Sequence, residues 1–298
     1  MRSGFVSIVG RPNVGKSTLT NAMVGDKVAI TSSKPQTTRH TIRGIVHRGS
    51  GQLVLVDTPG VHRPRTLLGE RLNAMVAEAW SEVDVIVMCI PADEVIGPGD
   101  RFIAAQIAEM KRTPKVAVLT KIDSISKKLI GERLLAVQEL GVETGIDWAH
   151  IVPVSAKAGE QVELLTELLI GMLPEGGALY PEHEVTDEPE YVRIAELIRE
   201  ASLEGVRDEL PHSIAVVVDE ITYNDNHSRA TVYAHVYVER DSQKSIVIGK
   251  GGSRLKEIGT QARAEVSELL GMPVHLDIRV SLAKDWQRDP KALDRLGF

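Results

Sequence analysis

The stretch Gly10-Arg11-Pro12-Asn13-Val14-Gly15-Lys16-Ser17 decides the fold class of this chain. It matches the phosphate-loop pattern, in which a glycine, four variable residues and a second glycine precede Lys and then Ser or Thr. The stretch follows the apolar run Phe5–Val9 and precedes the helical pattern Thr18–Val24, and we predict that its eight residues and Thr18 bind the nucleotide. Backbone N–H groups in such a strand-to-helix turn bind phosphate oxygens, while Lys16 reaches the β- and γ-phosphates and the Ser17 hydroxyl binds Mg²⁺. A glycine-rich turn without a ligand is the alternative, but the pattern and its context predict a nucleoside triphosphate site.

Apolar runs recur through the first 155 residues and indicate the architecture around this loop. Most of them are continuous rather than alternating, which is typical of strands buried on both faces of a mostly parallel sheet. Helical patterns occur between or after them, at Leu67–Trp80 and Gly159–Leu173. We therefore predict an α/β domain over residues 1–174, with helices on both faces of the sheet. The six runs are Phe5–Val9, Thr41–Val46, Leu53–Val56, Val85–Ile90, Lys115–Leu119 and Ile151–Val154.

Length and composition leave room for a second domain and exclude several classes of protein. The 298 residues suffice for about two domains of ordinary size. A hydrophobic content of 43% excludes disorder, and a net charge of −6 excludes binding to nucleic acid by bulk charge alone. The single cysteine, Cys89, cannot form an internal disulfide and is expected in the core. No apolar run approaches the ~18 residues that a membrane-spanning helix needs, and no cleavable signal peptide is expected.

The composition changes between residues 174 and 190, a stretch with three prolines and no Lys or Arg. We predict a linker over residues 175–190 and a small α+β domain over residues 191–298. The predicted strand Arg229–Glu239 alternates apolar and polar residues, which indicates an antiparallel sheet with one wet face. The predicted elements of this domain are, in order, a helix beginning at Tyr191, strands Ser213–Tyr223 and Arg229–Glu239, helices Ser242–Ile248 and Ser253–Leu270, and a strand Pro273–Leu282.

Three further motifs each follow a predicted strand of the first domain directly. Asp57-Thr58-Pro59-Gly60 offers a carboxylate to the Mg²⁺ shell and the Gly60 N–H to the γ-phosphate, although Pro-Gly is also an ordinary turn. Thr120-Lys121-Ile122-Asp123 offers the Asp123 carboxylate to the N1–H and 2-amino groups of guanine, with a solvated loop acid as the alternative. Ser155-Ala156-Lys157 offers backbone N–H groups to the guanine oxygen. In this order, the motifs predict that the nucleotide is GTP.

The sequence Gly249-Lys250-Gly251-Gly252 lies between two predicted helices and matches the GxxG loop that grips about four nucleotides of single-stranded RNA. In isolation such a tetrapeptide is often a helix-capping turn. Residues 244–263 favour RNA, because they hold five basic residues and one acidic residue in an acidic chain, although a solvated charged face is the alternative. The nine histidines lack the partner spacing of a zinc site, so none is predicted. The candidate RNA-binding residues are Lys244, Ile248, Gly249, Lys250, Gly251, Gly252, Arg254 and Lys256.

Together with Gln36-Thr37-Thr38-Arg39-His40, the phosphate loop makes the chain resemble the Era family of GTPases from end to end. The resemblance implies hydrolysis of GTP to GDP and phosphate, and a C-terminal KH domain of the second type. It implies that the RNA is the 3′ end of small-subunit ribosomal RNA, bound during 30S assembly by a cytoplasmic protein with some peripheral membrane contact. Candidates for an apolar groove for bases, some of which must instead be core, are Ile246, Val247, Ile248, Leu255 and Ile258.

The resemblance also assigns roles to single residues. In the family a threonine before the position of Asp57 ligates Mg²⁺; Thr38 is our choice and Thr37 the alternative, with Ser17 and Asp57 completing the set. Asn13 suggests that K⁺ supplies positive charge during hydrolysis, although Asn is also common in turns. The residues implied in catalysis are Lys16, Thr38, Gly60 and Asn13. We expect bound GTP to order residues 31–41 and 61–71 and thereby to control RNA binding.

Two positions differ from other GTPases: Thr120 bears on nucleotide affinity, and Val61, a hydrophobic residue as the resemblance to Era implies, bears on the rate of hydrolysis. Thr120 stands where the family has Asn, so the amide that braces the base pocket against the phosphate loop is reduced to a hydroxyl. Val61 stands where many regulatory GTPases have the glutamine that orients the attacking water, so slow hydrolysis is expected. Two other functions stay open: an RNA-binding adaptor that holds GTP with negligible turnover, and an ATP-dependent RNA enzyme.

Overall fold

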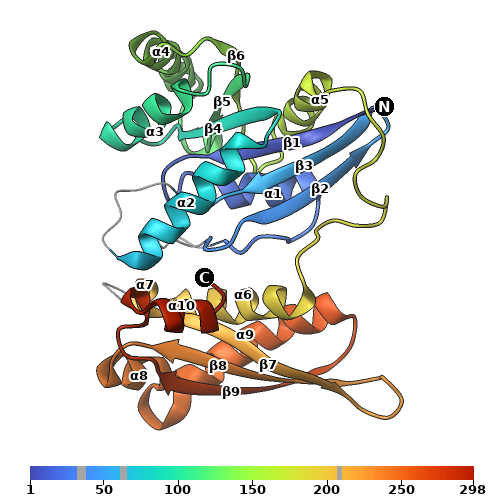
Figure 1. Cartoon of the computed structure of the whole chain (residues 1–298), viewed down its shortest axis with the longest axis vertical. Coiled ribbons are helices and arrows are strands. Elements are labelled where there is room, and N and C mark those ends of the chain that lie inside the picture. Colours follow the sequence, from blue (N-terminus) through green and yellow to red (C-terminus); the bar gives the residue numbers. More distant parts are fainter. Residues whose placement is uncertain (32–37, 61–65, 207–209) are drawn as a thin grey trace. The chain divides into compact units, whose positions relative to one another are not determined.

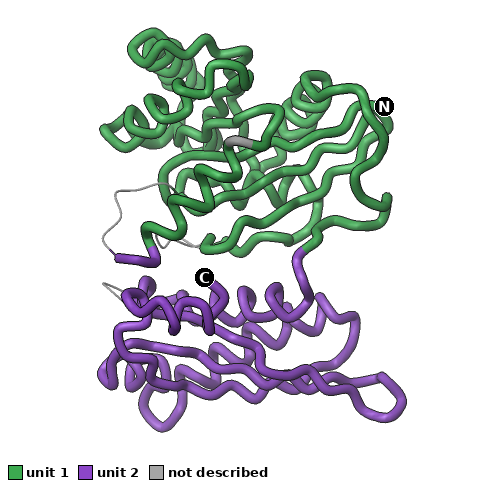
Figure 2. The backbone as a smooth tube through the Cα atoms, in the orientation of Figure 1, with its two compact units in different colours: residues 1–31, 37–64, 69–187 green, residues 32–36, 65–68, 188–298 purple. Residues whose placement is uncertain are grey.

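The computed structural model describes residues 1–31, 38–60, 66–206 and 210–298. The chain divides into two compact units, one with residues 1–31, 37–64 and 69–187 and one that includes residues 188–298 (Figure 2). Each unit has its own sheet, of six strands in the first unit and three in the second. Within the described ranges, no helix has the length and apolar character needed to cross a bilayer.

The first unit is built on a sheet with the strand order β2-β3-β1-β4-β5-β6 (Figure 1). The edge strand β2 is antiparallel to β3 and the other pairs are parallel, which confirms the predicted mostly parallel sheet. Every residue of β3, β4 and β5 is buried, as continuous apolar strands require. The strands are β1 (Arg2–Val9), β2 (Ile42–Arg48), β3 (Gly51–Asp57), β4 (Val85–Pro91), β5 (Lys115–Thr120) and β6 (Trp148–Pro153).

Helices cover both faces of this sheet, as predicted. They are α1 (Lys16–Val24), α2 (Leu67–Ser81), α3 (Pro98–Ala108), α4 (Lys127–Thr144), α5 (Val162–Met172) and the short η1 (Ile122–Ser124). Side chains of each central strand alternate between the two faces. In β4, Val87 and Cys89 join the core formed with α1 and α5, while Met88 joins the core formed with α2, α3 and α4. Cys89 is fully buried, which confirms the expectation that it is a core residue.

Residues 175–187 run along the edge of the first unit, and we call this segment the strap. The carbonyl oxygen of Val185 accepts a hydrogen bond from a backbone N–H of β2 at 2.8 Å. The side-chain amide of Gln52 in β3 bonds backbone groups of the strap at 2.6 and 2.7 Å. Arg43 of β2 forms an ion pair with Asp187 at 3.0 Å. The contact boundary between the two units therefore falls after Asp187, inside the stretch that the sequence predicts as a linker.

The second unit is an α+β domain with the sheet order β7-β8-β9. The strands β7 and β8 are antiparallel, but β9 is parallel to β8, so the prediction of an antiparallel sheet is wrong for this pair. The helices between β8 and β9 return the chain to the same end of the sheet, which is how a parallel pair is connected. The elements are α6 (Glu190–Leu203), α7 (Leu210–Ser213), β7 (Ala215–Tyr223), β8 (Ala230–Val238), α8 (Asp241–Ile248), η2 (Lys250–Gly252), α9 (Ser253–Leu270), β9 (Val274–Leu282), η3 (Trp286–Arg288) and α10 (Pro290–Arg295).

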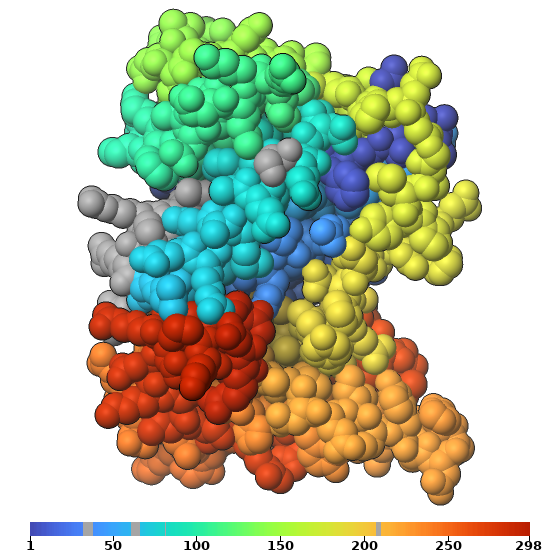
Figure 3. Space-filling view, in the orientation of Figure 1, coloured from blue at the N-terminus to red at the C-terminus, as the bar shows by residue number. Residues whose placement is uncertain are grey.

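The second sheet has one buried face, as the alternation in β8 predicts. Val232 and Val236 are fully buried, whereas Tyr233 between them is 36% exposed. The C-terminal segment packs onto this domain through Trp286, which is buried and stacks on Phe298 with ring centroids 5.4 Å apart. This segment, coloured red, covers part of the surface of the unit in Figure 3.

Candidate functional site

The predicted phosphate loop connects β1 to α1. It turns at Asn13 and Gly15, whose φ angles are 64° and 98°. Lys16 opens α1 and is buried, and its Nζ donates to the carbonyl oxygens of Gly10 at 3.1 Å and Arg11 at 3.0 Å. Burial lowers the pKa of Lys16, and the nearby Asp57 carboxylate opposes this effect. Backbone carbonyls of the loop therefore hold the Lys16 ammonium in place, at the position where the phosphate-loop pattern requires a cation.

The three predicted metal ligands form an oxygen-rich site beside the loop. The hydroxyls of Ser17 and Thr38 are hydrogen bonded to each other at 3.0 Å. Asp57 is fully buried, and neither of its carboxylate oxygens makes a hydrogen bond of ordinary geometry to a residue that the structure describes, although the Ser17 hydroxyl is close enough to favour its charged form. Burial raises the pKa of Asp57 to about 6, against the positive charge of Lys16. A buried carboxylate beside the Ser17 hydroxyl, with acceptor capacity left for another ligand, suits the hard, oxygen-preferring Mg²⁺, so the residues present fit this ion. Thr37, the alternative to Thr38, lies outside the described residues.

The chain that follows β3 lies against the phosphate loop. Its sequence is Asp57-Thr58-Pro59-Gly60. The Thr58 hydroxyl donates to the Ile8 carbonyl of β1 at 3.1 Å. A Cβ at Gly60 would lie 2.8 Å from the backbone nitrogen of Pro12, so only glycine permits this approach. Gly60 therefore lies directly against the phosphate loop. Val61 lies outside the described residues.

The base side of the site joins three strand ends through short hydrogen bonds. The Thr120 hydroxyl donates to the Val14 carbonyl at 2.6 Å, and the Ile90 carbonyl lies 3.3 Å from the same oxygen. The Ser155 hydroxyl donates to Asp123 Oδ1 at 2.6 Å and accepts a bond from the Ala158 N–H at 3.0 Å. The structure therefore brings the Thr120 and Ser155 motifs together around Asp123, with one oxygen of Asp123 held in place. Among the other predicted GTP-binding residues, Thr18 and Lys157 are exposed and Ala156 is half-buried.

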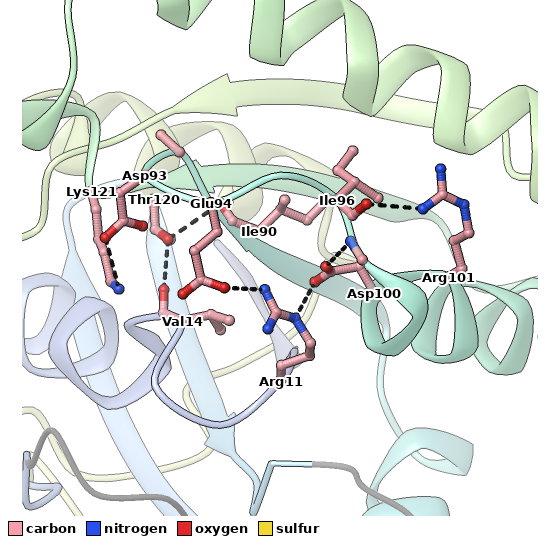
Figure 4. A network of polar contacts seen from close by, with 12 residues as sticks. Arg11, Val14, Ile90, Asp93, Glu94, Ile96, Asp100, Arg101, Thr120 and Lys121 are labelled. Carbon is pink, nitrogen blue, oxygen red and sulfur yellow. Dashed lines mark hydrogen bonds and ion pairs between the residues drawn. The ribbon is translucent and has the colours of Figure 1, made fainter.

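Sequence reasoning missed two acidic residues that contact the phosphate loop, Glu94 and Asp100. The Arg11 guanidinium donates from Nε to Asp100 Oδ1 and from Nη2 to Glu94 Oε2, both at 2.8 Å (Figure 4). In the same network Lys121 Nζ lies 3.4 Å from Asp93 Oδ2. A sequence separation of 89 residues between Arg11 and Asp100 leaves no local signal that would have revealed the pair.

The predicted RNA loop joins α8 to α9 in the second unit. Gly249, Gly251 and Gly252 have positive φ angles of 72°, 60° and 80°. A Cβ at Gly249 would lie 2.7 Å from the Cβ of Arg254, whereas a Cβ at Gly251 or Gly252 would meet nothing within 4 Å. The loop backbone around Gly251 is therefore open to a phosphate group, and glycine is required at position 249, where a Cβ would collide with Arg254.

The side chains near this loop divide into accessible and structural ones. Lys250 and Lys256 are exposed and Lys244 is half-buried. Arg254 donates to the Glu204 carbonyl and lies 3.4 Å from Glu257, so it also has a structural role. Of the apolar candidates, Ile246 is exposed, Ile248 and Leu255 are half-buried, and Val247 and Ile258 are core.

Comparison with known proteins identifies the family. A family model described as a 50S ribosome-binding GTPase matches residues 5–121, and a KH domain model matches residues 209–287. GTPase Era of Streptomyces coelicolor is 62% identical over 301 residues, which cover 100% of this chain and 95% of the relative. The chain belongs to the Era family of GTPases. GTPase Era of Mycolicibacterium smegmatis is 64% identical over 299 residues, which cover 100% of this chain and 99% of the relative.

Two solved Era structures share the fold of the whole chain. A point variant of Aquifex aeolicus Era bound to GDP·AlF4⁻ has a TM-score of 0.94 at 37% identity, covering 100% of this chain and 99% of that one. Era in complex with MgGDPNP and nucleotides 1506–1542 of 16S ribosomal RNA has a TM-score of 0.94 at 36% identity, with the same coverage. The predicted family, fold class and GTPase activity are thus confirmed, and the second unit is a KH domain.

Proposed function

We propose that this Era-family GTPase couples its nucleotide state to binding of the 3′ end of small-subunit ribosomal RNA during 30S assembly. The observation that carries the proposal is the end-to-end likeness to the Era complex that holds both MgGDPNP and 16S ribosomal RNA, at a TM-score of 0.94. The chain has a site for each ligand, the phosphate loop in the first unit and the GxxG loop in the second.

In the nucleotide site, Lys16 and the loop backbone bind the phosphates, and the Asp123 carboxylate selects guanine. Ser17, Thr38 and Asp57 would hold Mg²⁺, which when bound neutralises charge that develops on the phosphates. The buried Asp57 carboxylate, whose oxygens make no hydrogen bond of ordinary geometry within the described ranges, supports this assignment. Gly60 offers its N–H to the γ-phosphate, because it approaches the loop at Pro12.

Hydrolysis is expected to be slow because a valine at position 61 cannot orient water by hydrogen bonding. Asn13 is exposed and has the left-handed backbone conformation, which fits either a turn residue or a ligand to K⁺. Turnover should therefore be faster in K⁺ than in Na⁺ buffer if Asn13 helps to hold this ion. Equal rates in the two buffers would leave Asn13 as a turn residue only.

The loop Gly249–Gly252 is the proposed RNA-binding element. Its accessible backbone N–H groups and the exposed Lys250 can contact RNA phosphates. The deciding experiment measures GTP turnover and RNA affinity in K⁺ buffer, with a single-stranded RNA that copies the 3′ end of the small-subunit RNA. Gly251→Asp adds a negative charge at this loop and should abolish both RNA binding and stimulation by RNA. Gly271→Asp is a matched control, because Gly271 has a similar φ of 64° and nothing within 4 Å of a built Cβ, at the far end of α9. Equal RNA affinity in the two variants would contradict the proposed grip.

Membership of the Era family of GTPases argues against both alternatives, an adaptor that only holds GTP and an ATP-dependent RNA enzyme. Asp123→Asn should weaken the preference for guanine nucleotides over adenine nucleotides. The peripheral membrane contact and cytoplasmic location implied by the resemblance stay predictions; co-sedimentation with anionic vesicles tests the former.

A further inference from the structure

The Arg11 side chain occupies a position that the phosphate-loop pattern leaves unspecified. The backbone carbonyl of Arg11 accepts a hydrogen bond from the Lys16 ammonium at 3.0 Å. The guanidinium of Arg11 instead reaches the start of α3 (Figure 4). There it pairs with Asp100, whose side chain is 0% exposed, and with Glu94, whose side chain is 50% exposed. An ion pair with an exposed carboxylate such as Glu94 adds little to the folding free energy. Removing the partner of a buried carboxylate such as Asp100 is costly, because it leaves an uncompensated charge in the interior.

Both carboxylate oxygens of Asp100 accept a hydrogen bond. Its Oδ1 accepts from Arg11 Nε at 2.8 Å, and its Oδ2 accepts from the Gly97 N–H at 2.9 Å at the N-terminus of α3. The stem of Arg11 lies over Gly99, where a Cβ would come within 2.6 Å of Arg11 Cδ. Burial opposes the charge on Arg11, but the bonds to Asp100 and Glu94 outweigh it and raise the pKa of Arg11. The phosphate loop is therefore attached to the first turn of α3 by a charged pair and by close packing.

The segment that precedes α3 also contacts the base side of the site. The Ala92 N–H donates to the Thr120 carbonyl at 2.9 Å, and Asp93 lies 3.4 Å from the Lys121 ammonium. Residues 92–100 thus connect the phosphate loop, through Arg11, with the guanine-recognition motif.

We propose that Arg11 is a positioning residue whose pair with Asp100 holds the phosphate loop in its nucleotide-binding form and so sets nucleotide affinity rather than the rate of the chemical step. The inference rests on the proposed GTP site. A loop that loses this attachment and adopts the binding form about a tenth of the time binds nucleotide about tenfold more weakly. Once nucleotide is bound the loop is ordered, so the rate at saturation stays the same.

The test uses the full chain, a fluorescent GDP analogue for affinity, and single-turnover hydrolysis at saturating GTP. Arg11→Met keeps the length of the stem and removes the charge, and should raise the Kd about tenfold with the saturated rate within about twofold. Arg11→Lys keeps the charge and should recover part of the affinity. Combining Arg11→Met with Asp100→Asn should weaken binding no further than the worse single variant, because both changes break one pair.

Arg101→Met is the matched control on the same helix, because Arg101 pairs with Glu143 at 3.1 Å and with the Ile96 carbonyl at 2.9 Å. It should leave the Kd within about twofold of the parent, and urea unfolding without nucleotide confirms that each variant is folded. An unchanged Kd in Arg11→Met, an equal rise in Arg101→Met, or a fall in the saturated rate alone would each overturn the inference. If Arg11→Met does not fold, the same readouts on Asp100→Asn decide, since this variant breaks the same pair and an unchanged Kd in it would overturn the inference. Failure of the parent chain to bind the GDP analogue would instead count against the proposed function.

Discussion

Replacing Thr120 by Val tests whether one hydroxyl ties the guanine-recognition motif to the phosphate loop. Thr120 is 3% exposed, and its hydroxyl donates to the Val14 carbonyl at 2.6 Å. Valine keeps the shape of the side chain but removes the donor. The buried carbonyl then loses its partner, which costs about 1–3 kcal/mol of folding free energy. For a domain of this size that corresponds to a fall in Tm of about 2–4 °C for each kcal/mol.

The unfolding of the first unit can be followed separately. Trp80 and Trp148 lie in this unit and Trp286 in the other, and the chain has three tryptophans. In a Trp286→Phe background, fluorescence in urea therefore reports the first unit, and the midpoint and slope give its free energy of unfolding.

The Ser variant supplies the comparison, since Thr120→Ser keeps the hydroxyl and removes a methyl group worth about 0.8 kcal/mol. We expect Thr120→Val to be the more destabilising of the two. A Val variant that loses less free energy than the Ser variant would refute the idea that the hydroxyl bond braces the loop. Thr120→Asn, which restores the residue usual in the family, should retain the bond to Val14 through its amide.

Three further predictions concern other parts of the first unit. Gly60→Ala would place a methyl group 2.8 Å from the Pro12 nitrogen and so displace the contacts to the γ-phosphate. Single-turnover GTP hydrolysis should slow about 100-fold, and an unchanged rate would contradict this. Cys89 is buried and burial raises its pKa to about 12, so the native chain should not react with a thiol reagent until it unfolds, when one thiol should react. The bond from Arg48 lowers the pKa of Glu163, so its contribution to stability is full above about pH 4.5 and is lost as the pH falls below that value. Because Glu163 is largely exposed, the loss should be at most about 1 kcal/mol and should disappear in Arg48→Met, as acid unfolding curves would show.

The strand positions of the first unit were predictable because continuous apolar runs report burial on two faces. The helix α4 was not, since its pattern is blurred by Leu135 and Val142, which are 67% and 77% exposed. In the second unit the alternation in β8 predicted which residues face the core, but alternation carries no information on strand direction, so the parallel pairing of β9 was missed.

In the candidate site, too, only part of the arrangement could be predicted from the sequence. Motif residues such as Lys16 and Asp123 lie where local pattern rules place them, at a strand end or helix start. The partners that hold them, such as Asp100 for Arg11, come from distant parts of the chain and follow only from the tertiary fold. Composition predicted a linker over residues 175–190, and it carries no information on the hydrogen bonds that Gln52 makes to the strap.

The strap has a consequence for how the GTPase domain can be isolated. The strand β2 is an edge strand, and unpaired edges are templates for aggregation. By pairing with β2 through Val185, the strap blocks part of that edge. A fragment that ends at Pro174 should expose this edge and remove the backbone partners of the Gln52 amide, and it should precipitate or self-associate in a concentration-dependent way. A fragment that ends at Asp187 keeps the strap over this edge and should stay monomeric in analytical ultracentrifugation.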